Sequence, residues 1–222
     1  MKNMVMVIIA LFICSCSSTP PVGEPFSVDI RSSRLEAGSI EAYLDKLFSS
    51  RDVKKTTFTV YYYPAEDVVC LRFKVNFYTC SQFWNRAGRD AFVGAFERYQ
   101  EEYEQQKLIR DNRKIMNIYG MTQGFFTWRL TTITTEAQGQ PLIKLGYQFK
   151  GDGVFFTTTQ MKSLYQDPLL RSRNQTSPVT KIYYSRSQAE NLIALFKQEY
   201  LQSLVLQNRT GGSNNSDVDR YW

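Results

Sequence analysis

A short turn between two runs of alternating apolar and polar residues constrains the fold of this chain more than any other feature. The turn is Pro64–Asp67, and the runs are Thr56–Tyr63 and Val68–Tyr78. With Tyr63 opposite Val68, the apolar side chains of both runs fall on the same face, as a true hairpin requires. The sequence therefore predicts an antiparallel hairpin, whose strands do not fit a doubly wound parallel sheet.

Three segments have the apolar spacing of amphipathic helices. A short helix is expected over Ser39–Phe48, with Ser39 as its N-cap, and a long helix is expected over Gln82–Arg110. The last helix is expected to open with the capping box Ser187–Glu190 and to end near Leu206.

Four more runs alternate or are rich in β-branched and aromatic residues, and they are predicted to be strands. The loop Gly151–Gly153 predicts a three-residue hairpin with Gly153 in the left-handed conformation, which places Phe149 opposite Phe155. A polar loop is expected over Lys162–Pro178. The four runs are Phe125–Thr135, Leu142–Lys150, Val154–Gln160 and Val179–Tyr184.

The order of these elements predicts an α+β fold. One antiparallel sheet of about five to six strands would be packed by two long helices and one short helix. This two-layer arrangement loosely resembles helix-grip folds, on the order of elements alone. A single domain is expected over residues 37–206, followed by a flexible tail over 207–222.

The composition excludes several classes of enzyme. Histidine is absent, which removes Ser-His-Asp and Cys-His hydrolysis and the helical His-Glu-x-x-His zinc site. The four cysteines are too few for a thiolate metal cage once the first two are assigned to the N-terminal segment. Neither glycine-rich phosphate-binding motif is present. No metal, cofactor or catalytic residue is therefore expected.

The first residues have the layout of an export signal. Lys2 precedes an apolar run, Met4–Ile13, and small residues follow. Ten apolar residues in a helix cover about 15 Å, roughly half of a bilayer core. The run is therefore too short to cross a membrane and is interpreted as a signal peptide, residues 1–15.

The end of this run, Ile13-Cys14-Ser15-Cys16, resembles the lipobox of bacterial lipoprotein precursors. In that family the cysteine receives a diacylglycerol through its sulfur, the signal is cut before it, and the new amino terminus is acylated. Cys16 fits best, because Ser15 precedes it and Ile13 lies three residues before it. Cys14 is the alternative, and an ordinary secretory signal with chance cysteines is the other interpretation.

The resemblance implies a membrane-anchored protein. Residues 16–36 would form a lipidated N-terminus and tether, since Ser17 to Pro25 is rich in serine and proline. In the lipoprotein family, the serine after the modified cysteine favours the outer membrane over the inner membrane. An exported protein of this kind is not expected to meet nucleic acid.

Two cysteines, Cys70 and Cys80, remain after removal of the signal. Ten residues of extended strand would separate them by roughly 33 Å, far beyond the reach of a disulfide. Only a sharp bend of the chain near Tyr78 would allow the alternative, a Cys70–Cys80 disulfide. Two independent thiols on or near the polar face of the hairpin are therefore expected, and without histidine neither is expected to be a nucleophile.

The acidic residues are interpreted as solvated surface. Glu66-Asp67 lies in a turn, Glu101-Glu102 is placed on the exposed side of a helix, and Asp152 is a turn former. The charge is uneven: residues 105–186 hold 12 Lys and Arg against 4 Asp and Glu, whereas residues 17–104 hold 11 against 13. The basic half could lie against anionic head groups, although scattered solubilising charge is the preferred interpretation.

These observations favour a non-enzymatic interaction or structural module of the cell envelope, held at a membrane by its lipid and bound to an envelope protein. The first alternative is a carrier of lipids or other amphiphiles, in which the 29 Phe and Tyr residues line an apolar cavity. The second alternative is a hydrolase that uses two carboxylates and needs no histidine.

Overall fold

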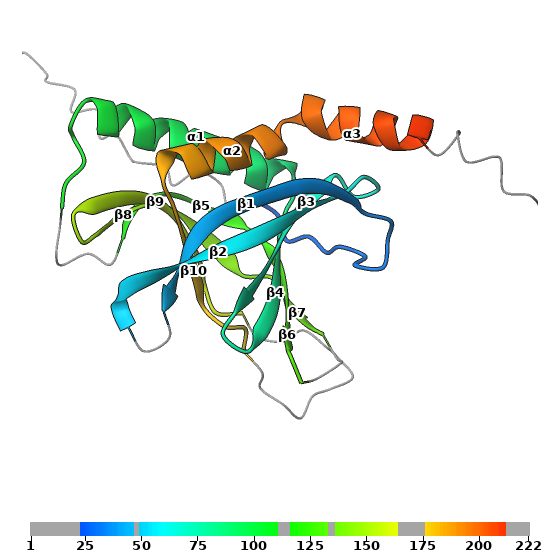
Figure 1. The fold of residues 1–222 in the computed structure, drawn as a ribbon, viewed down its shortest axis with the longest axis horizontal. Coiled ribbons are helices and arrows are strands. Elements are labelled where there is room, and N and C mark those ends of the chain that lie inside the picture. Colours follow the sequence, from blue (N-terminus) through cyan, green and yellow to red (C-terminus); the bar gives the residue numbers. More distant parts are fainter. Residues whose placement is uncertain (1–22, 47–48, 111–115, 133–135, 164–175, 212–222) are drawn as a thin grey trace, which may run out of the picture.

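The computed structural model describes residues 23–46, 49–110, 116–132, 136–163 and 176–211. They form one antiparallel sheet and three helices (Figure 1). Ten strands are hydrogen-bonded in the order β5-β8-β9-β10-β1-β2-β3-β4-β6-β7. The elements are β1 (Leu35–Lys46), β2 (Ser49–Tyr63), β3 (Val68–Val75), β4 (Tyr78–Trp84), α1 (Arg86–Glu104), β5 (Asn117–Gln123), β6 (Phe125–Leu130), β7 (Ala137–Gly139), β8 (Leu142–Lys150), β9 (Gly153–Gln160), β10 (Thr180–Tyr184), α2 (Arg186–Phe196) and α3 (Gln198–Gly211).

The expected fold class is wrong. An α+β fold with five to six strands packed by long helices was expected, but the molecule is mostly sheet, with ten strands. The sheet curls into a half-barrel, and the three helices lie along one end of it (Figure 1). The error arose because strands β1, β4, β5 and β7 were either assigned to helices or not recognised.

Residues 39–46 of the helix expected over Ser39–Phe48 belong instead to strand β1, and Leu47 and Phe48 lie outside the described residues. Ile40, Tyr43 and Leu44 have the spacing of one helical face, whereas alternate residues from Ile40 to Leu44 have the spacing of one strand face. The pairing with β2 decides between the two. Ile40, Ala42 and Leu44 alternate along β1, and all three are buried against the inner face of the sheet.

The hairpin predicted around Pro64–Asp67 is confirmed. Strand β2 places Tyr63 opposite Val68, in the register expected from the sequence. The second run does not continue to Tyr78 as one strand, because the chain turns at Asn76, whose φ is +52°.

The turn at Asn76 adds a strand, β4, where the start of the long helix was expected. Helix α1 therefore begins at Arg86 rather than Gln82 and ends at Glu104 rather than Arg110. Its N-cap is Asn85, whose side chain accepts a hydrogen bond from the backbone of Gly88.

Strands β5–β6 and β7–β8 form one bent antiparallel ribbon. Gly124 alone separates β5 from β6, and two residues separate β7 from β8. The N–H of Gly124 donates to the carbonyl of Pro141 at 2.9 Å, so the register that places Gln123 opposite Leu142 continues unbroken into β6 and β7. Because β5 and β7 are the two terminal strands of the sheet, this ribbon connects both ends of the sheet and makes it curl.

The hairpin between β8 and β9 is present, but its predicted register is wrong by one residue. Its turn has two residues, Gly151 and Asp152, so Phe149 lies opposite Val154. The residue with positive φ is Gly151, at +54°, and not Gly153. With this shorter turn, the hydrogen-bonded pairs of β8 and β9 begin one residue closer to the loop. The alternating sequence pattern does not specify the length of the turn.

The last helical region also differs from the expectation. The capping box is formed by Ser185 and Gln188 rather than by Ser187–Glu190. One helix ending near Leu206 was expected, but two helices are present. The backbone at Lys197 is extended, with ψ of 130°, and this separates α2 from α3.

Apolar side chains pack on both faces of the sheet. The inner cluster fills the space between the curled sheet and the helices, and it is rich in rings that contact one another edge to face. A smaller outer cluster is covered by the segment before β1, which lies within the expected tether. Its members are Phe26, Val28, Ile30, Tyr61, Tyr63, Val68, Cys70, Phe83 and Phe125.

The close approach of β5 to β8 makes Gly146 a sensitive position. A Cβ there would overlap the carbonyl of Asn117, so Gly146→Ala must displace strand β5. We expect Gly146→Ala to lower the free energy of unfolding by about 2 kcal/mol or more in urea denaturation.

Gly94→Ala is the matched control for this prediction. Gly94 is an exposed residue within α1, with open space where its Cβ would lie. This substitution is expected to raise the free energy of unfolding by about 0.5–1 kcal/mol. Equal effects of the two substitutions would contradict the proposed packing of β5.

Candidate functional site

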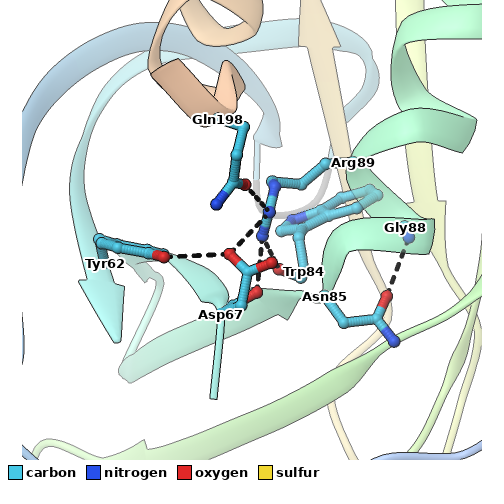
Figure 2. A network of polar contacts seen from close by, with 7 residues as sticks. All are labelled: Tyr62, Asp67, Trp84, Asn85, Gly88, Arg89 and Gln198. Atoms are coloured by element: carbon cyan, nitrogen blue, oxygen red, sulfur yellow. Dashed lines mark hydrogen bonds and ion pairs between the residues drawn. The ribbon is translucent and has the colours of Figure 1, made fainter. Parts of the chain in front are cut away.

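Arg89 is the only buried charged residue in the described part of the chain, with 2% of its surface exposed. Figure 2 shows that its guanidinium points into a ring of acceptors. Nη1 donates to the backbone carbonyls of Asp67, at 2.8 Å, and Trp84, at 3.4 Å. Nη2 donates to Oδ1 of Asp67 and to Oε1 of Gln198, both at 3.0 Å.

Four elements bring these groups together. Asp67 lies in the turn between β2 and β3, at a φ of +50°, and Trp84 ends β4. Arg89 lies in the first turn of α1, and Gln198 is the first residue of α3. The Arg89 side chain therefore connects a turn, a strand end and two helices that are far apart in the sequence.

The electrostatics of this network favour a neutral phenol at Tyr62. Tyr62 donates its hydroxyl to Oδ1 of Asp67 at 3.0 Å. Burial, and next the nearby Asp67 carboxylate, raise the pKa of Tyr62 above its ordinary value. The phenol therefore stays protonated and serves as a donor. Since the carboxylate and the guanidinium already bind protein groups, the network acts as a structural clamp.

A second polar cluster lies between α1 and β5. Oε1 of Glu102 accepts from Nε of Arg98 at 3.1 Å, and Oε2 accepts from the hydroxyl of Tyr119 at 2.8 Å. The Arg98 guanidinium also stacks on the Tyr119 ring, 4.9 Å from its centre. Burial, and next the bond to Glu102, raise the pKa of Tyr119. A hollow of about 380 Å³ opens beside these side chains.

A third polar site lies between β1 and the start of α2. A hollow of about 510 Å³ is lined there mostly by polar side chains. The Nζ of Lys55 and Oε2 of Glu41 form an exposed ion pair at 2.5 Å on its rim. The capping box uses the N–H groups of Ser185 and Gln188, at the edge of this hollow.

The interior of the half-barrel is not uniformly apolar. Seven buried polar side-chain atoms make no hydrogen bond within the described part of the chain, and all but the hydroxyl of Thr157 lie on the inner face of the sheet. They come from strands β4, β9 and β10, and each costs on the order of 1–3 kcal/mol of desolvation. These polar atoms lie beside the apolar side chains of the sheet, and the carrier of amphiphiles stays an untested alternative. The residues are Gln82, Trp84, Thr157, Thr158, Gln160, Thr180 and Tyr184.

Cys70 and Cys80 are free thiols, as expected, but their expected location on the polar face is wrong. Both are buried, Cys70 in the outer cluster and Cys80 in the inner cluster. The turn at Asn76 folds β4 back onto β3, so the two cysteines lie on adjacent strands but on opposite faces of the sheet. Burial raises the pKa of each thiol to about 12, which makes both poor nucleophiles.

The acidic residues singled out from the sequence lie on three separate elements. Glu66 is in the predicted turn and accepts from the hydroxyl of Ser32 at 3.2 Å. Glu101 is exposed on α1, as expected, whereas Glu102 is directed toward β5. Asp152 lies exposed in its turn. The structure does not bring these carboxylates together as a pair.

The described part of the chain contains neither a cluster of metal-ligand side chains nor a helix that could span a membrane. No group of three or more His, Cys, Asp or Glu side chains in this part is arranged to hold a metal ion. None of its helices combines the length and the apolar character needed to cross a membrane. Cys14 and Cys16, the predicted lipidation residues, lie outside the described residues.

Arg89 was not identified from the sequence. The signal that could have identified it is its position in α1, because residues 89, 92, 96 and 99 share one helical face. Phe92, Phe96 and Tyr99 are apolar and fully buried. A single arginine on such a face requires buried acceptors, but the sequence does not show where those acceptors come from.

Comparisons with known proteins place the chain in a family without indicating an activity. A family described as "Uncharacterised Treponema protein" matches residues 32–203, which are 172 of the 222 residues. An uncharacterized protein of Treponema pallidum (strain Nichols) is 29% identical over 118 residues. The match covers 53% of this chain and 42% of that relative, so the chain spans less than half of its length. No solved structure matches the chain.

The clamp around Arg89 should contribute strongly to stability. Arg89→Ala leaves buried acceptors without a donor, and we expect it to lower the free energy of unfolding by about 2–4 kcal/mol. Arg98→Ala removes an exposed i,i+4 pair on the same helix and is expected to cost under about 1 kcal/mol. Chemical denaturation of the two variants measures the difference, and similar losses would contradict the structural role of Arg89.

The buried thiols should resist modification in the folded protein. In a chain with Cys14→Ala and Cys16→Ala, we expect a water-soluble thiol reagent to label neither Cys70 nor Cys80 until denaturant is added.

The raised thiol pKa values also predict a pH dependence. The cysteine thiols of the unfolded chain ionise with a pKa of about 9.0, whereas those of the folded chain have a pKa of about 12. Folding stability should therefore fall as the pH rises through this window. Rapid labelling of the native chain at pH 8 would contradict the burial of both thiols.

Proposed function

The chain belongs to the family of uncharacterised Treponema proteins, and we propose that it is a lipid-anchored protein of the cell envelope that acts by binding another envelope component. The observation that carries this proposal is the sequence Ile13-Cys14-Ser15-Cys16 directly after the apolar run Met4–Ile13. This arrangement resembles a lipoprotein signal, with Cys16 as the acylated residue. Two or three acyl chains on one residue anchor a protein stably, whereas a single chain binds reversibly.

An interaction role fits the distribution of polar groups in the folded body. The guanidinium of Arg89 and the carboxylates of Asp67 and Glu102 are bonded to other protein groups at distances between 2.8 and 3.4 Å. Such groups hold the fold together and are not poised for proton transfer. The body is therefore best suited to present a stable surface to a partner, and Ser17 supports a location at the outer membrane.

The anchor can be tested by metabolic labelling with a clickable fatty-acid probe in a bacterium that expresses the chain. We expect label in the wild type and in Cys14→Ala, and none in Cys16→Ala, because only one sulfur accepts the diacylglycerol. Mass spectrometry of the N-terminal peptide checks the site.

Each other outcome of this experiment has a defined meaning. Label retained in Cys16→Ala and lost in Cys14→Ala would move the anchor to Cys14. An unlabelled wild-type chain with a free amino terminus would overturn the proposal.

A further inference from the structure

The segment that leads into β1 lies on the outer face of the sheet as a strap, which we define as residues 23–34. The strap forms neither a helix nor a strand (Figure 1). Within the described residues, no backbone hydrogen bond joins it to the sheet. Val28, with 7% of its surface exposed, is the only buried residue of the strap. A segment held by so few contacts opens at a lower free energy than a paired strand does.

The first half of the strap is held mainly by apolar side chains. Phe26, Val28 and Ile30 all belong to the outer cluster. The ring centre of Phe26 lies 6.4 Å from that of Phe125. Nε2 of Gln140 donates to the backbone carbonyl of Phe26 at 3.1 Å.

The second half of the strap has polar contacts close to the start of β1. The hydroxyl of Ser32 donates to Oε2 of Glu66 at 3.2 Å. Nη1 of Arg34 donates to the hydroxyl of Tyr63 at 3.4 Å. Because these contacts lie next to the paired residue Leu35, they mark the place where the strap hinges when its first half leaves the sheet.

The strap covers an apolar patch of the sheet, which we call the covered surface. All other members of the outer cluster come from β2, β3, β4 and β6, so the strap is the only layer of described apolar residues packed over them. Without the strap, these side chains would form an exposed patch with four aromatic rings, and such patches mark interaction sites. The covered surface consists of Tyr61, Tyr63, Val68, Cys70, Phe83 and Phe125.

The strap also shows which chemistry the covered surface accepts. Its apolar side chains stand at alternate positions, with the exposed Ser27 and Asp29 between them. The amide of Gln140 recognises a backbone carbonyl, a group that a peptide offers and a hydrocarbon chain does not. The matching ligand is therefore an extended polypeptide segment with apolar side chains at every second residue.

We propose that the covered surface is the docking surface for such an extended segment of an envelope protein, and that the strap detaches to admit it. The strap is joined to the surface by the chain and competes with the partner at an effective concentration on the order of millimolar. The strap therefore keeps the apolar patch covered until the partner segment displaces it. This inference deepens the proposed function and rests on it for the nature of the partner.

The two cysteines report on the strap separately. Cys70 belongs to the covered surface, whereas Cys80 lies in the inner cluster. In the chain with Cys14→Ala and Cys16→Ala, labelling by iodoacetamide is followed in urea below the unfolding transition. We expect Cys70 to react at least about tenfold faster than Cys80, because opening of the strap exposes the outer face alone.

Two variants separate opening of the strap from unfolding of the chain. Val28→Ser removes the buried side chain of the strap and is expected to raise the labelling rate of Cys70 by at least about tenfold. Ile182 lies in the inner cluster and stays packed when the strap opens. Ile182→Val is therefore expected to raise the labelling rate of Cys80 by about threefold or more and to leave that of Cys70 unchanged. An equal rise at both cysteines in Ile182→Val would overturn the detachable strap.

Peptides added to the full chain test the covered surface as a docking site. The first fluorescent peptide has the sequence of residues 23–34, and its matched control carries Phe26→Ser, Val28→Ser and Ile30→Ser. We expect the first peptide to bind the Val28→Ser chain at least about tenfold more tightly than the chain with Val28, whose own strap competes better. The control peptide should bind at least about tenfold more weakly than the first peptide.

A third peptide, of twelve alternating leucine and serine residues, stands for the partner segment. It is expected to bind the Val28→Ser chain at least about tenfold more tightly than the control peptide does. Binding of the strap peptide without binding of this third peptide would overturn the proposed partner. A strap-exchanged dimer of the wild-type chain at high concentration would also overturn it, because a second copy would then occupy the surface.

Equal binding of the strap peptide and its serine control would overturn the docking surface itself. Thermal unfolding of each variant shows that a change in labelling or binding is not a loss of fold. None of these measurements needs the lipid. Absence of the fatty-acid label would overturn the proposed anchor and leave these results unchanged, so the two failures are distinguishable.

Discussion

The bent ribbon formed by β5–β6 and β7–β8 is the constraint on which the rest of the structure depends. One half of the ribbon pairs with β9 and the other half pairs with β4, so two distant parts of the sheet are held by the same pair of strands. A side chain at Gly124 would meet Ile143 of the facing strand, so the bend needs a residue without a Cβ. The curled sheet then offers a concave face that the aromatic residues of α1 and α2 fill.

The Arg89 clamp fixes the helices to this sheet through polar contacts rather than apolar ones. A buried guanidinium is tolerated only when its donors find acceptors. Here those acceptors come from the β2–β3 turn, the end of β4 and the first residue of α3. The clamp therefore specifies where α3 starts relative to α1.

The sequence by itself determined the local features: the β2–β3 hairpin and its register, the turn position of Asp67, the presence of α1, and the lipobox-like segment at Cys16. Each of these depends on residues close together in the chain. The tertiary structure decided the period of β1, the one-residue register of β8 and β9, the break at Lys197 and the acceptors of Arg89. The physical reason is that Ile40, Tyr43 and Leu44 have helical spacing, whereas Ile40, Ala42 and Leu44 have strand spacing, and only the pairing with β2 decides between the two. A buried arginine likewise depends on groups that only the folded chain brings within hydrogen-bond distance.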